Sequence, residues 1–580
     1  MDFSPESGPS SRPGWIIGAA ALAALLLLLG RNALVSSEGD LAECVREILQ
    51  GREVFPCGGV WVPDAPGDLF LGRLTALLAG VLGNTEWTLR LPSVLAALLT
   101  LGGTMKLTAA FFDRKTAFAA GWLTIGSYGF LFWGRHASWH MMPAATTVWC
   151  AVLLVRSEKR FASAAALGVL ALTGMLWWGW FFLLPLLALT PLFRQGGFVR
   201  AGKWYWCGAG LTAALAALAG FGLLICSFAP GIGEIPRYAL EMEYEVWHTS
   251  RVLMLWPGAG NLSWYGALEN LPRLLLPWVP LTAVALAGMI VRRRELSPDV
   301  RRLLWTAGLL MALTGIFPGR RWQYQLPMLP VFLVLTAGGV TGECGVERWN
   351  FRVGQGMEIL FSLLGSLAAA VAVTYPVWDM LLKVSPPLSI MVGVPLLGLL
   401  AVVLLIFDTG PTCAVERSSG MRGAWSGYIL AGTVLSVALW SVTVPSLTKF
   451  RSGRPFWRKC GAIVRTFPPE NIILAGNPPN ASELYYLDLP GEATAVAEPE
   501  PFRRCLNSCI KGGQAVVILR RRDAEKFIRA TLGTRWGWRE KPEIREGVPL
   551  RLVGKADKEE KRYELYCLDL LKYGGKQHAK

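Results

Sequence analysis

The chain has 580 residues, of which 53% are hydrophobic and 17% are charged. Ordinary soluble proteins carry roughly 25% charged residues, so this composition, with a mean hydropathy of +0.40, excludes a disordered, a collagen-like or a typical cytosolic protein. A net charge of +16 would suit nucleic-acid binding if it formed one continuous stripe. The basic residues instead form small clusters between apolar runs, as in the cytoplasmic loops of membrane proteins, and we expect no nucleic-acid partner.

The apolar runs predict a polytopic α-helical membrane protein. A run of about 17 to 22 apolar residues crosses a hydrocarbon core of roughly 30 Å, and about thirteen such runs occur in the sequence. An amino terminus in the cytoplasm places the basic clusters inside, and residues 35–90 and 229–273 then form outer loops. The predicted spans lie at about 14–34, 91–112, 116–133, 141–155, 161–176, 178–193, 205–228, 274–291, 303–318, 326–340, 357–375, 387–407 and 425–445.

The composition changes near residue 447, where a mixed and basic segment replaces the apolar runs. We therefore divide the chain into a cytoplasmic lead (1–13), a transmembrane domain (14–446) and a soluble domain (447–580). An odd number of spans puts this last domain on the outer side. Its order of strand-like and helix-like segments favours a small α/β fold: extended stretches at Ile472 to Ala475, Val516 to Leu519 and Tyr563 to Leu568 alternate with helical patterns near 482–487 and 524–532.

The first outer loop carries the strongest chemical signal. The stretch SSEGDLAECVREILQG (36–51) places Glu38 and Asp40 directly after the first predicted span and then begins an amphipathic helix. Carboxylates at a membrane surface are costly unless they are wet or paired, so several together indicate a solvated cavity at the interface. A solvated helix face is the other interpretation of the same pattern.

The order of several segments resembles integral-membrane glycosyltransferases of the C superfamily (GT-C). The chain is most similar to the branch that contains aminoarabinose transferase and relatives of protein O-mannosyltransferases. The resemblance covers most of residues 14–445 and fades in the tail. Its segments are VREIL (45–49), DAPGDLFLGRLTALLAGVLG (64–83), NTEWTLRLPSVLAAL (84–98), GRHASWHMMPAATT (134–147), NLSWYGALENLPRLLLPWVPL (261–281) and GRRWQYQLPMLPVFLVL (319–335).

The resemblance implies an enzyme that takes a sugar from a polyprenyl phosphate in the membrane and passes it to a lipid, glycan or protein acceptor at the outer face. Such an enzyme needs a carboxylate to deprotonate or position the acceptor hydroxyl and cations to hold the phosphate leaving group. The branch also implies the bacterial inner membrane, with the tail domain in the periplasm. We predict Glu38 and Asp40 as catalytic residues, and as substrate-binding residues Asp64, Arg73, Arg135, His140, Tyr265, Arg320, Arg321 and Tyr324.

This sequence departs from the family at three expected functional positions. The family's Asp-Glu pair aligns with Ser37 and Glu38, its phosphate-binding Lys with Ala65, and the Asp of its second outer loop with His140. Two hypotheses follow: a divergent transferase that uses Glu38 or Asp40 as its base, or a retained fold that serves as a lipid-binding or assembly subunit.

A secondary transporter is the alternative from a different class. It predicts charges buried at mid-membrane and two similar halves, whereas the acidic residues here lie in outer loops and Lys106 is among the few charges within a span. No cofactor is required by these patterns. The acidic segment EMEYEVWH (241–248) has carboxylates at alternate positions that are able to join a divalent metal site, although a solvated face has the same spacing.

Overall fold

The computed structural model describes two compact units, one formed by residues 1–30 and 62–446 and the other by residues 31–61 and 447–580. The described residues within these units are 12–31, 34, 36–51, 66–156, 169–171, 173–174, 182–192, 266–315, 322–341, 353, 356–357, 359–361, 363–364, 426–443, 454–468, 471–475, 481–489, 494–496, 514–520, 550–555 and 563–569.

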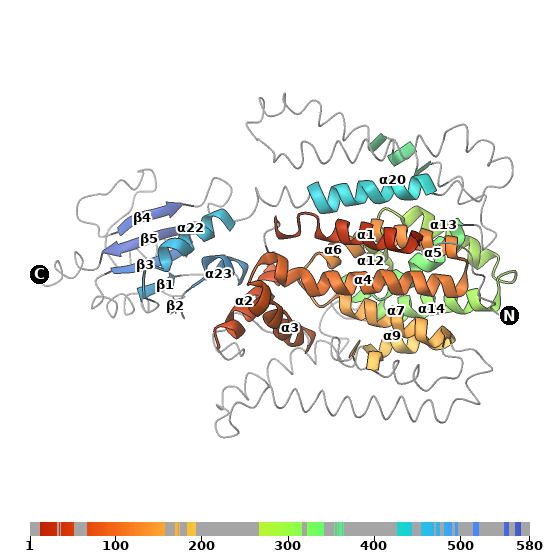
Figure 1. Ribbon diagram of the computed structural model, residues 1–580, viewed down its shortest axis with the longest axis horizontal. Helices are drawn as coiled ribbons and strands as arrows, with labels where there is room; N and C mark the ends of the chain where they lie inside the picture. Colours follow the sequence, from red (N-terminus) through yellow and green to blue (C-terminus); the bar gives the residue numbers. More distant parts are fainter. Residues whose placement is uncertain are drawn as a thin grey trace, which may run out of the picture. The chain divides into compact units, whose positions relative to one another are not determined.

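The first unit is helical (Figure 1). Its α-helices are α1 (Arg12–Leu26), α3 (Pro66–Leu82), α4 (Glu86–Phe111), α5 (Arg114–Gly126), α6 (Tyr128–Gly134), α7 (Met141–Arg156), α9 (Leu183–Ala188), α12 (Gly266–Leu275), α13 (Val279–Val291), α14 (Pro298–Gly315), α15 (Met328–Val340) and α20 (Ser426–Val437). Short 3-10 turns occur at η3 (Thr190–Leu192) and η4 (Trp322–Gln325), and α20 continues as a π-helical turn, η5 (Ala438–Thr443).

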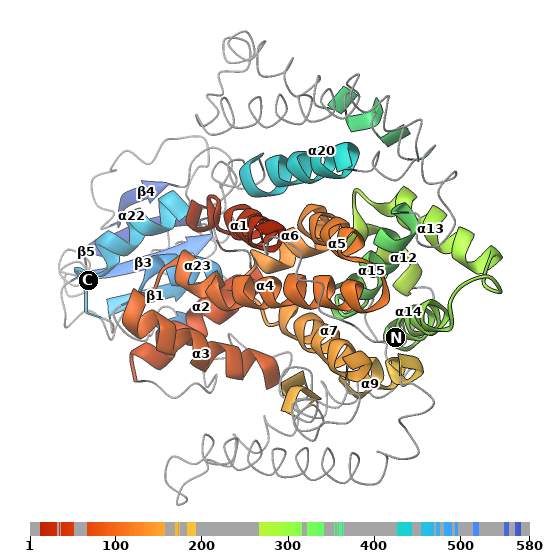
Figure 2. The same ribbon diagram turned by 45° about the vertical axis from the view of Figure 1, so that its right-hand side comes forward.

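The helix α4 is 26 residues long and, within the described part of the chain, is the one helix both long and apolar enough to cross a membrane. Its start is fixed by Thr85, whose hydroxyl accepts the backbone N–H of Thr88 at 3.2 Å, in the usual manner of an N-cap. In both ribbon views α4 lies between α1 and α7 (Figures 1 and 2). Close packing with α7 requires a small residue at Gly103, because a Cβ there would lie 2.5 Å from the Val148 side chain.

Helices occupy many of the predicted spans, with two differences in detail. The predicted span at 116–133 is broken at Ser127 into α5 and α6, because the bend between α12 and α13 packs against it: Tyr128 N–H donates to the Leu276 carbonyl at 2.8 Å, and the Trp278 indole donates to the Leu123 carbonyl at 2.8 Å. The predicted first outer loop also contains an apolar helix, α3. The spans expected at 205–228 and 387–407 lie outside the described residues.

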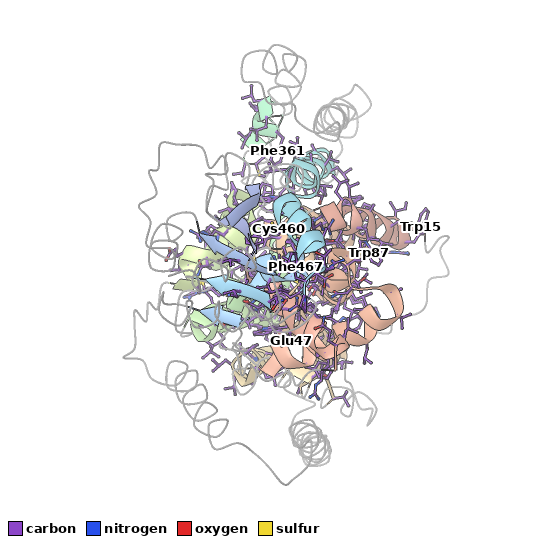
Figure 3. The ribbon with its side chains drawn as sticks, turned by 90° about the vertical axis from the view of Figure 1, so that its left-hand side faces the viewer. Trp15, Glu47, Trp87, Phe361, Cys460 and Phe467 are labelled. Carbon is purple, nitrogen blue, oxygen red and sulfur yellow. The ribbon has the colours of Figure 1, made fainter. Side chains whose placement is uncertain are left out.

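Large apolar side chains occur both in the core of this unit and on its surface. The helix α15 is buried along its whole length, against α4, α5, α13 and α14. Large apolar side chains are nevertheless exposed around the unit, including Trp15 at 65%, Val81 at 85% and Trp305 at 69%; Trp15 projects at the edge of the ribbon in Figure 3. Soluble monomers rarely expose so much apolar surface, and a helical unit of this kind suits a lipid environment, in which all backbone groups must bond internally.

The second unit combines a helix from the first loop with a sheet from the tail. The helix α2 (Ser36–Leu49) packs against α23 (Ala481–Leu487), and α22 (Arg454–Val464) packs against α23. The sheet has the strand order β2-β1-β3-β5-β4, in which β2, β1 and β3 are parallel and β5 is antiparallel to both β3 and β4. The strands are β1 (Ile472–Ala475), β2 (Thr494–Val496), β3 (Gln514–Arg520), β4 (Leu550–Lys555) and β5 (Tyr563–Asp569).

Candidate functional site

Both residues predicted to be catalytic lie in the first turns of α2. Glu38 is buried, at 1% exposure, and Asp40 is partly exposed. Immediately before the helix, Leu34 N–H donates to the Tyr486 hydroxyl at 2.8 Å, so the chain entering α2 is anchored to α23. Carboxylates near a helix N-terminus interact favourably with the helix dipole.

One residue that the sequence analysis missed is Arg46, on the same helix. Arg46 is buried at 6% exposure and forms an ion pair with Glu43 through Nη2. Its Nε and Nη1 atoms are buried and donate no hydrogen bond within the described residues. A buried cation with unused donors is expensive, and an anion is the ligand that would satisfy these donors. The three-residue spacing of Glu43 and Arg46 in an amphipathic helix was the only signal of this arrangement in the sequence.

Two predicted substrate-binding residues from distant segments come together in the first unit. His140, in the turn before α7, and Tyr324, in η4, have ring centroids 5.9 Å apart in an edge-on arrangement. Trp133 and Trp139 flank the His140 ring at 4.8 and 4.4 Å. The next residue, Gln325, is buried at 4% exposure, and its Oε1 accepts no hydrogen bond in the part of the chain that the structure describes. The cluster therefore joins aromatic faces to polar groups, the combination found in sites that orient a small ligand.

Arg135, also predicted to bind substrate, is turned toward the end of α1. Its Nη1 donates to the carbonyls of Ala24 and Leu25 at 2.7 and 2.8 Å, and its Nη2 donates to the carbonyl of Leu27 at 2.6 Å. Burial, and then the neighbouring charge of Arg90, lower the pKa of Arg135 to about 9. The guanidinium therefore remains charged at neutral pH while it caps the helix.

The other predicted site residues are less informative. Arg73 lies on α3 with an exposed side chain. Asp64, Tyr265, Arg320 and Arg321 lie outside the described residues, as does the acidic segment 241–248. Within the described ranges, no three His, Cys, Asp or Glu side chains are grouped so as to hold a metal ion.

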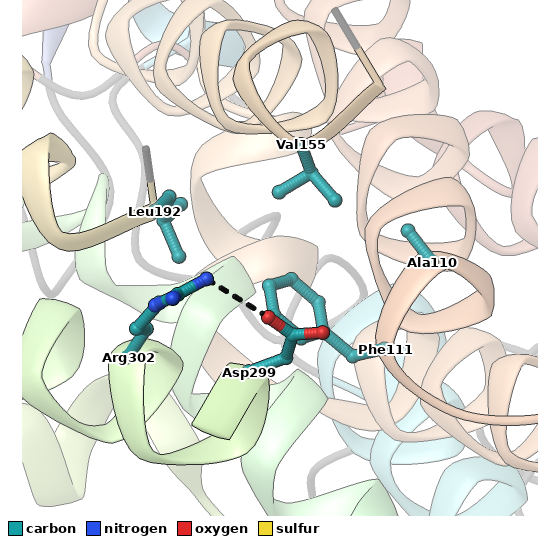
Figure 4. A pocket seen from close by; sticks show the side chains of 6 residues that line it. All are labelled: Ala110, Phe111, Val155, Leu192, Asp299 and Arg302. Carbon is teal, nitrogen blue, oxygen red and sulfur yellow. Dashed lines mark hydrogen bonds and ion pairs between the residues drawn. The ribbon is translucent and has the colours of Figure 1, made fainter. Parts of the chain in front are cut away.

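A small pocket elsewhere in the first unit does not coincide with any predicted site residue (Figure 4). It lies where α4 and α7 end and α14 begins, and is lined by Ala110, Phe111, Val155, Leu192, Asp299 and Arg302. Asp299 and Arg302 pair with each other across 3.1 Å. His140, a predicted site residue, lies at the opposite end of α7 from this pocket.

Comparison with solved structures identifies the fold. ArnT from Cupriavidus metallidurans in the apo state superposes with a TM-score of 0.63 and 16% sequence identity, covering 96% of this chain and 98% of that one. The same protein bound to undecaprenyl phosphate gives a TM-score of 0.64 and 14% identity over the same shares. An oligosaccharyltransferase from Archaeoglobus fulgidus, AglB, gives 0.41 and 15% over 82% of this chain and 59% of that one.

No protein-family model matches the sequence, and no curated protein matches it. The match to ArnT nevertheless extends over nearly the full length of both chains. The fold expected from the sequence resemblance is thus confirmed: this chain shares the fold of ArnT over nearly its whole length.

Proposed function

We propose that this protein is an integral-membrane glycosyltransferase that moves a sugar from a polyprenyl-phosphate-linked donor to a lipid, glycan or protein acceptor at the outer face of the membrane. The observation that carries the proposal is the near-complete match in fold to ArnT, a protein whose structure has been determined with undecaprenyl phosphate bound. The described residues also include candidates for the groups that this reaction needs, which are a base for the acceptor hydroxyl and a cation for the phosphate.

The reaction requires one bond to form and one to break. The acceptor hydroxyl oxygen attacks the anomeric carbon of the donor sugar, and the bond from that carbon to the phosphate oxygen breaks. The polyprenyl phosphate leaves with the bonding electrons, and the hydroxyl proton passes to a base. Glu38 and Asp40 are the carboxylates that we assign to this base, with Glu38 the stronger candidate because it is sheltered from bulk water.

Negative charge grows on the phosphate as it leaves, and fixed cations stabilise that charge most effectively where water is excluded. Arg46 suits this role because its Nε and Nη1 donors are buried without a hydrogen-bond partner among the described residues, and charge-assisted hydrogen bonds to phosphate oxygens are strong. We assign His140 and Tyr324 to donor binding, since their rings meet beside the buried amide of Gln325.

The proposed setting is a bacterial inner membrane, with residues 447–580 in the periplasm. This orientation is supported by the basic clusters between predicted spans. It also places the outer loops on the side where a lipid-linked sugar, once moved to the outer leaflet, meets its acceptor.

A second candidate is a binding or assembly subunit that has kept the fold and lost the chemistry. The observation that favours it is the replacement of three expected functional residues, at Ser37, Ala65 and His140. Such a protein would still bind polyprenyl phosphate, because the apolar helices remain, but it would turn over no donor.

The decisive experiment measures sugar transfer by the purified protein in lipid nanodiscs, with a panel of polyprenyl phosphate sugars and a lipid extract of the native host as acceptor. We expect transfer by the wild type, and a loss of at least 100-fold in Glu38→Gln or Asp40→Asn, the size expected when a general base is removed. Glu47→Gln, which removes a charge from the same helix, is the matched control and should retain activity. Binding of polyprenyl phosphate without turnover of any donor would instead establish the binding subunit.

A further inference from the structure

Helix α4 presents a row of outward-facing positions along its length. Leu95 and Leu99 are 55% and 54% exposed, and the row continues through Gly102, which is partly exposed, to Lys106, which is exposed. Residues three and four positions apart lie on one face of a helix, so these four form a continuous strip, which we call the α4 stripe. Because α4 is long and apolar enough to cross a membrane, its exposed leucines suit contact with lipid chains.

The α4 stripe ends in a cation. The ammonium of Lys106 lies over the Trp149 ring, 4.6 Å from the ring centroid, as in a cation–π contact. Trp149 is itself fixed, because its Nε1 donates to the Leu99 carbonyl at 3.0 Å. A charge on a lipid-facing surface is costly unless it meets a polar or charged group. The indole therefore holds the ammonium at a place where an anionic group of a lipid would stabilise it.

The same face of α4 leads to the small pocket of Figure 4. Ala110 lies one helical turn beyond Lys106 and lines this pocket, and Asp299 and Arg302 project into it from α14. Among the described residues, Arg302 binds Asp299 through one nitrogen, Nη1. Its side chain is 26% exposed, and a guanidinium has five N–H donors. Arg302 therefore has donors left for a second anion.

The surface around this pocket is strongly basic. It is formed by the turn between α4 and α5 and by the connection from α13 into α14, which meet where Phe111 and Asp299 line the pocket. An excess of one sign of charge raises the local concentration of ligands of the opposite sign. Within residues 112–115 and 292–302, the cations Arg114, Lys115, Arg292, Arg293, Arg294, Arg301 and Arg302 outnumber the carboxylates Asp113, Glu295 and Asp299.

We propose that this end of the helical unit binds an anionic phospholipid from the adjoining leaflet. One acyl chain lies along the α4 stripe, and the headgroup phosphate contacts Lys106 and Arg302. Basic pockets between transmembrane helices bind anionic headgroups, and Arg forms strong charge-assisted bonds with phosphate. In the proposed orientation this is the cytoplasmic leaflet. The site lies at the opposite end of α7 from His140, so it is separate from the proposed donor site.

The test is native mass spectrometry of the full-length protein in detergent, titrated separately with phosphatidylglycerol, which is anionic, and phosphatidylcholine, which is zwitterionic. We expect the wild type to bind phosphatidylglycerol at least about 10-fold more tightly. Lys106→Met and Arg302→Gln should each weaken that binding about 10-fold, as expected for the loss of one charge-assisted hydrogen bond, and leave phosphatidylcholine binding unchanged. Equal binding of the two lipids by the wild type would overturn the proposal. No sugar donor is present, so the result does not depend on the proposed function.

Arg301→Gln is the matched control, because it removes the same charge from the neighbouring position of α14, which does not line the pocket. Its affinity for phosphatidylglycerol should change by no more than about twofold. An equal loss in Arg301→Gln and Arg302→Gln would mean that the basic surface attracts lipid diffusely, without a site. Lys106→Arg keeps the charge and should keep the affinity; if it binds as weakly as Lys106→Met, the charge at this position does not hold the headgroup.

Asp299 provides a test in the opposite direction. Its carboxylate occupies Nη1 of Arg302 and repels an incoming phosphate. Asp299→Asn should therefore raise the affinity for phosphatidylglycerol about two- to fivefold, the range expected for an exposed ion pair. An unchanged or lower affinity would mean that Arg302 serves its ion pair and does not bind the headgroup.

The acyl-chain contact is tested at Gly102. A Cβ there would lie 4.0 Å from the Trp149 ring, which is ordinary contact, so Gly102→Ala is tolerated and serves as the control. Gly102→Leu fills the space beside the indole and should weaken binding of long-chain phosphatidylglycerol several-fold, with no change for a short-chain form. Unchanged binding of the long-chain lipid in Gly102→Leu would exclude the α4 stripe from the site.

Discussion

Arg46 carries a positive charge into the interior of the second unit, where Glu43 neutralises it but occupies only one of its nitrogens. Its role as a phosphate ligand is separable from its role as a partner of Glu43. Replacing Arg46 alone breaks its buried ion pair with Glu43, and breaking a buried pair destabilises a protein by about 3–5 kcal/mol. The informative variant is therefore the neutral double replacement Glu43→Gln with Arg46→Gln.

We expect the double variant to fold and to raise the donor KM about 10- to 100-fold, because charge-assisted hydrogen bonds worth about 1.5–3 kcal/mol are lost. Glu43→Gln alone, which keeps Arg46, is the matched control; once thermal unfolding has verified that it is folded under the assay conditions, it should bind donor normally. Donor titrations of the wild type, of Glu43→Gln and of the double variant measure this change in KM. If the double variant binds donor with wild-type affinity, Arg46 serves only as the ion-pair partner of Glu43 and does not bind the phosphate.

At this scale the sequence predicts which residue types matter better than it predicts their partners. His140 and Tyr324 could be picked out from separate segments, and the structure brings their rings together. Arg135 could also be picked out, but its partners are backbone carbonyls more than a hundred positions away, which no local pattern encodes. Arg90 gave no signal beyond a charge at the start of an apolar run.

Among the elements, α22 offers a test of packing through one thiol. Cys460 is a free cysteine on this helix, 2% exposed (Figure 3), and burial raises its pKa to about 12. At pH 9, three pH units below that value, about one thiol in a thousand is ionised, against about half in an unfolded chain with a pKa of 9.0. Only the thiolate reacts with iodoacetamide.

We therefore expect Cys460 to resist alkylation at pH 9 in the native protein and to react rapidly after denaturation, as followed by mass-spectrometric mapping. The same pKa shift makes the free energy of unfolding depend on pH. As the pH rises, the thiol of the unfolded chain loses its proton first. The contribution of Cys460 to stability is therefore complete below pH 9 and is lost as the pH rises from 9 toward 12. Rapid native labelling at pH 9 would mean that α22 does not pack as described.

Helices and strands that are determined by a local run of residues could be predicted from the sequence, whereas features that depend on distant contacts could not. The strands β1, β3 and β5 coincide with short apolar runs, and helices α4, α7 and α15 with long ones. The break at Ser127 was not predictable, because it depends on Trp278, which lies far along the chain. The three-residue strand β2 is too short for alternation to reveal, and β4 exists through its pairing with β5.

For the whole molecule, the proposed orientation makes a prediction that is independent of catalysis. In right-side-out membrane vesicles, a protease added outside should remove the 447–580 domain, and a fluorescent protein fused before residue 1 should remain protected. The physical reason is that Lys and Arg in short loops are retained in the cytoplasm. Protection of the tail until the vesicles are opened would reverse the topology.

The burial of α15 has a consequence for how the protein is made. Although this helix is apolar throughout, its side chains meet other helices and not lipid. Its main partners, α4, α5, α13 and α14, all precede it in the chain. These partner helices have therefore already been synthesised when α15 emerges from the ribosome, and α15 docks against helices that are already present. Chains that stop before residue 322 should leave the surfaces of α4, α5, α13 and α14 that α15 covers exposed to the quality-control proteases of the membrane.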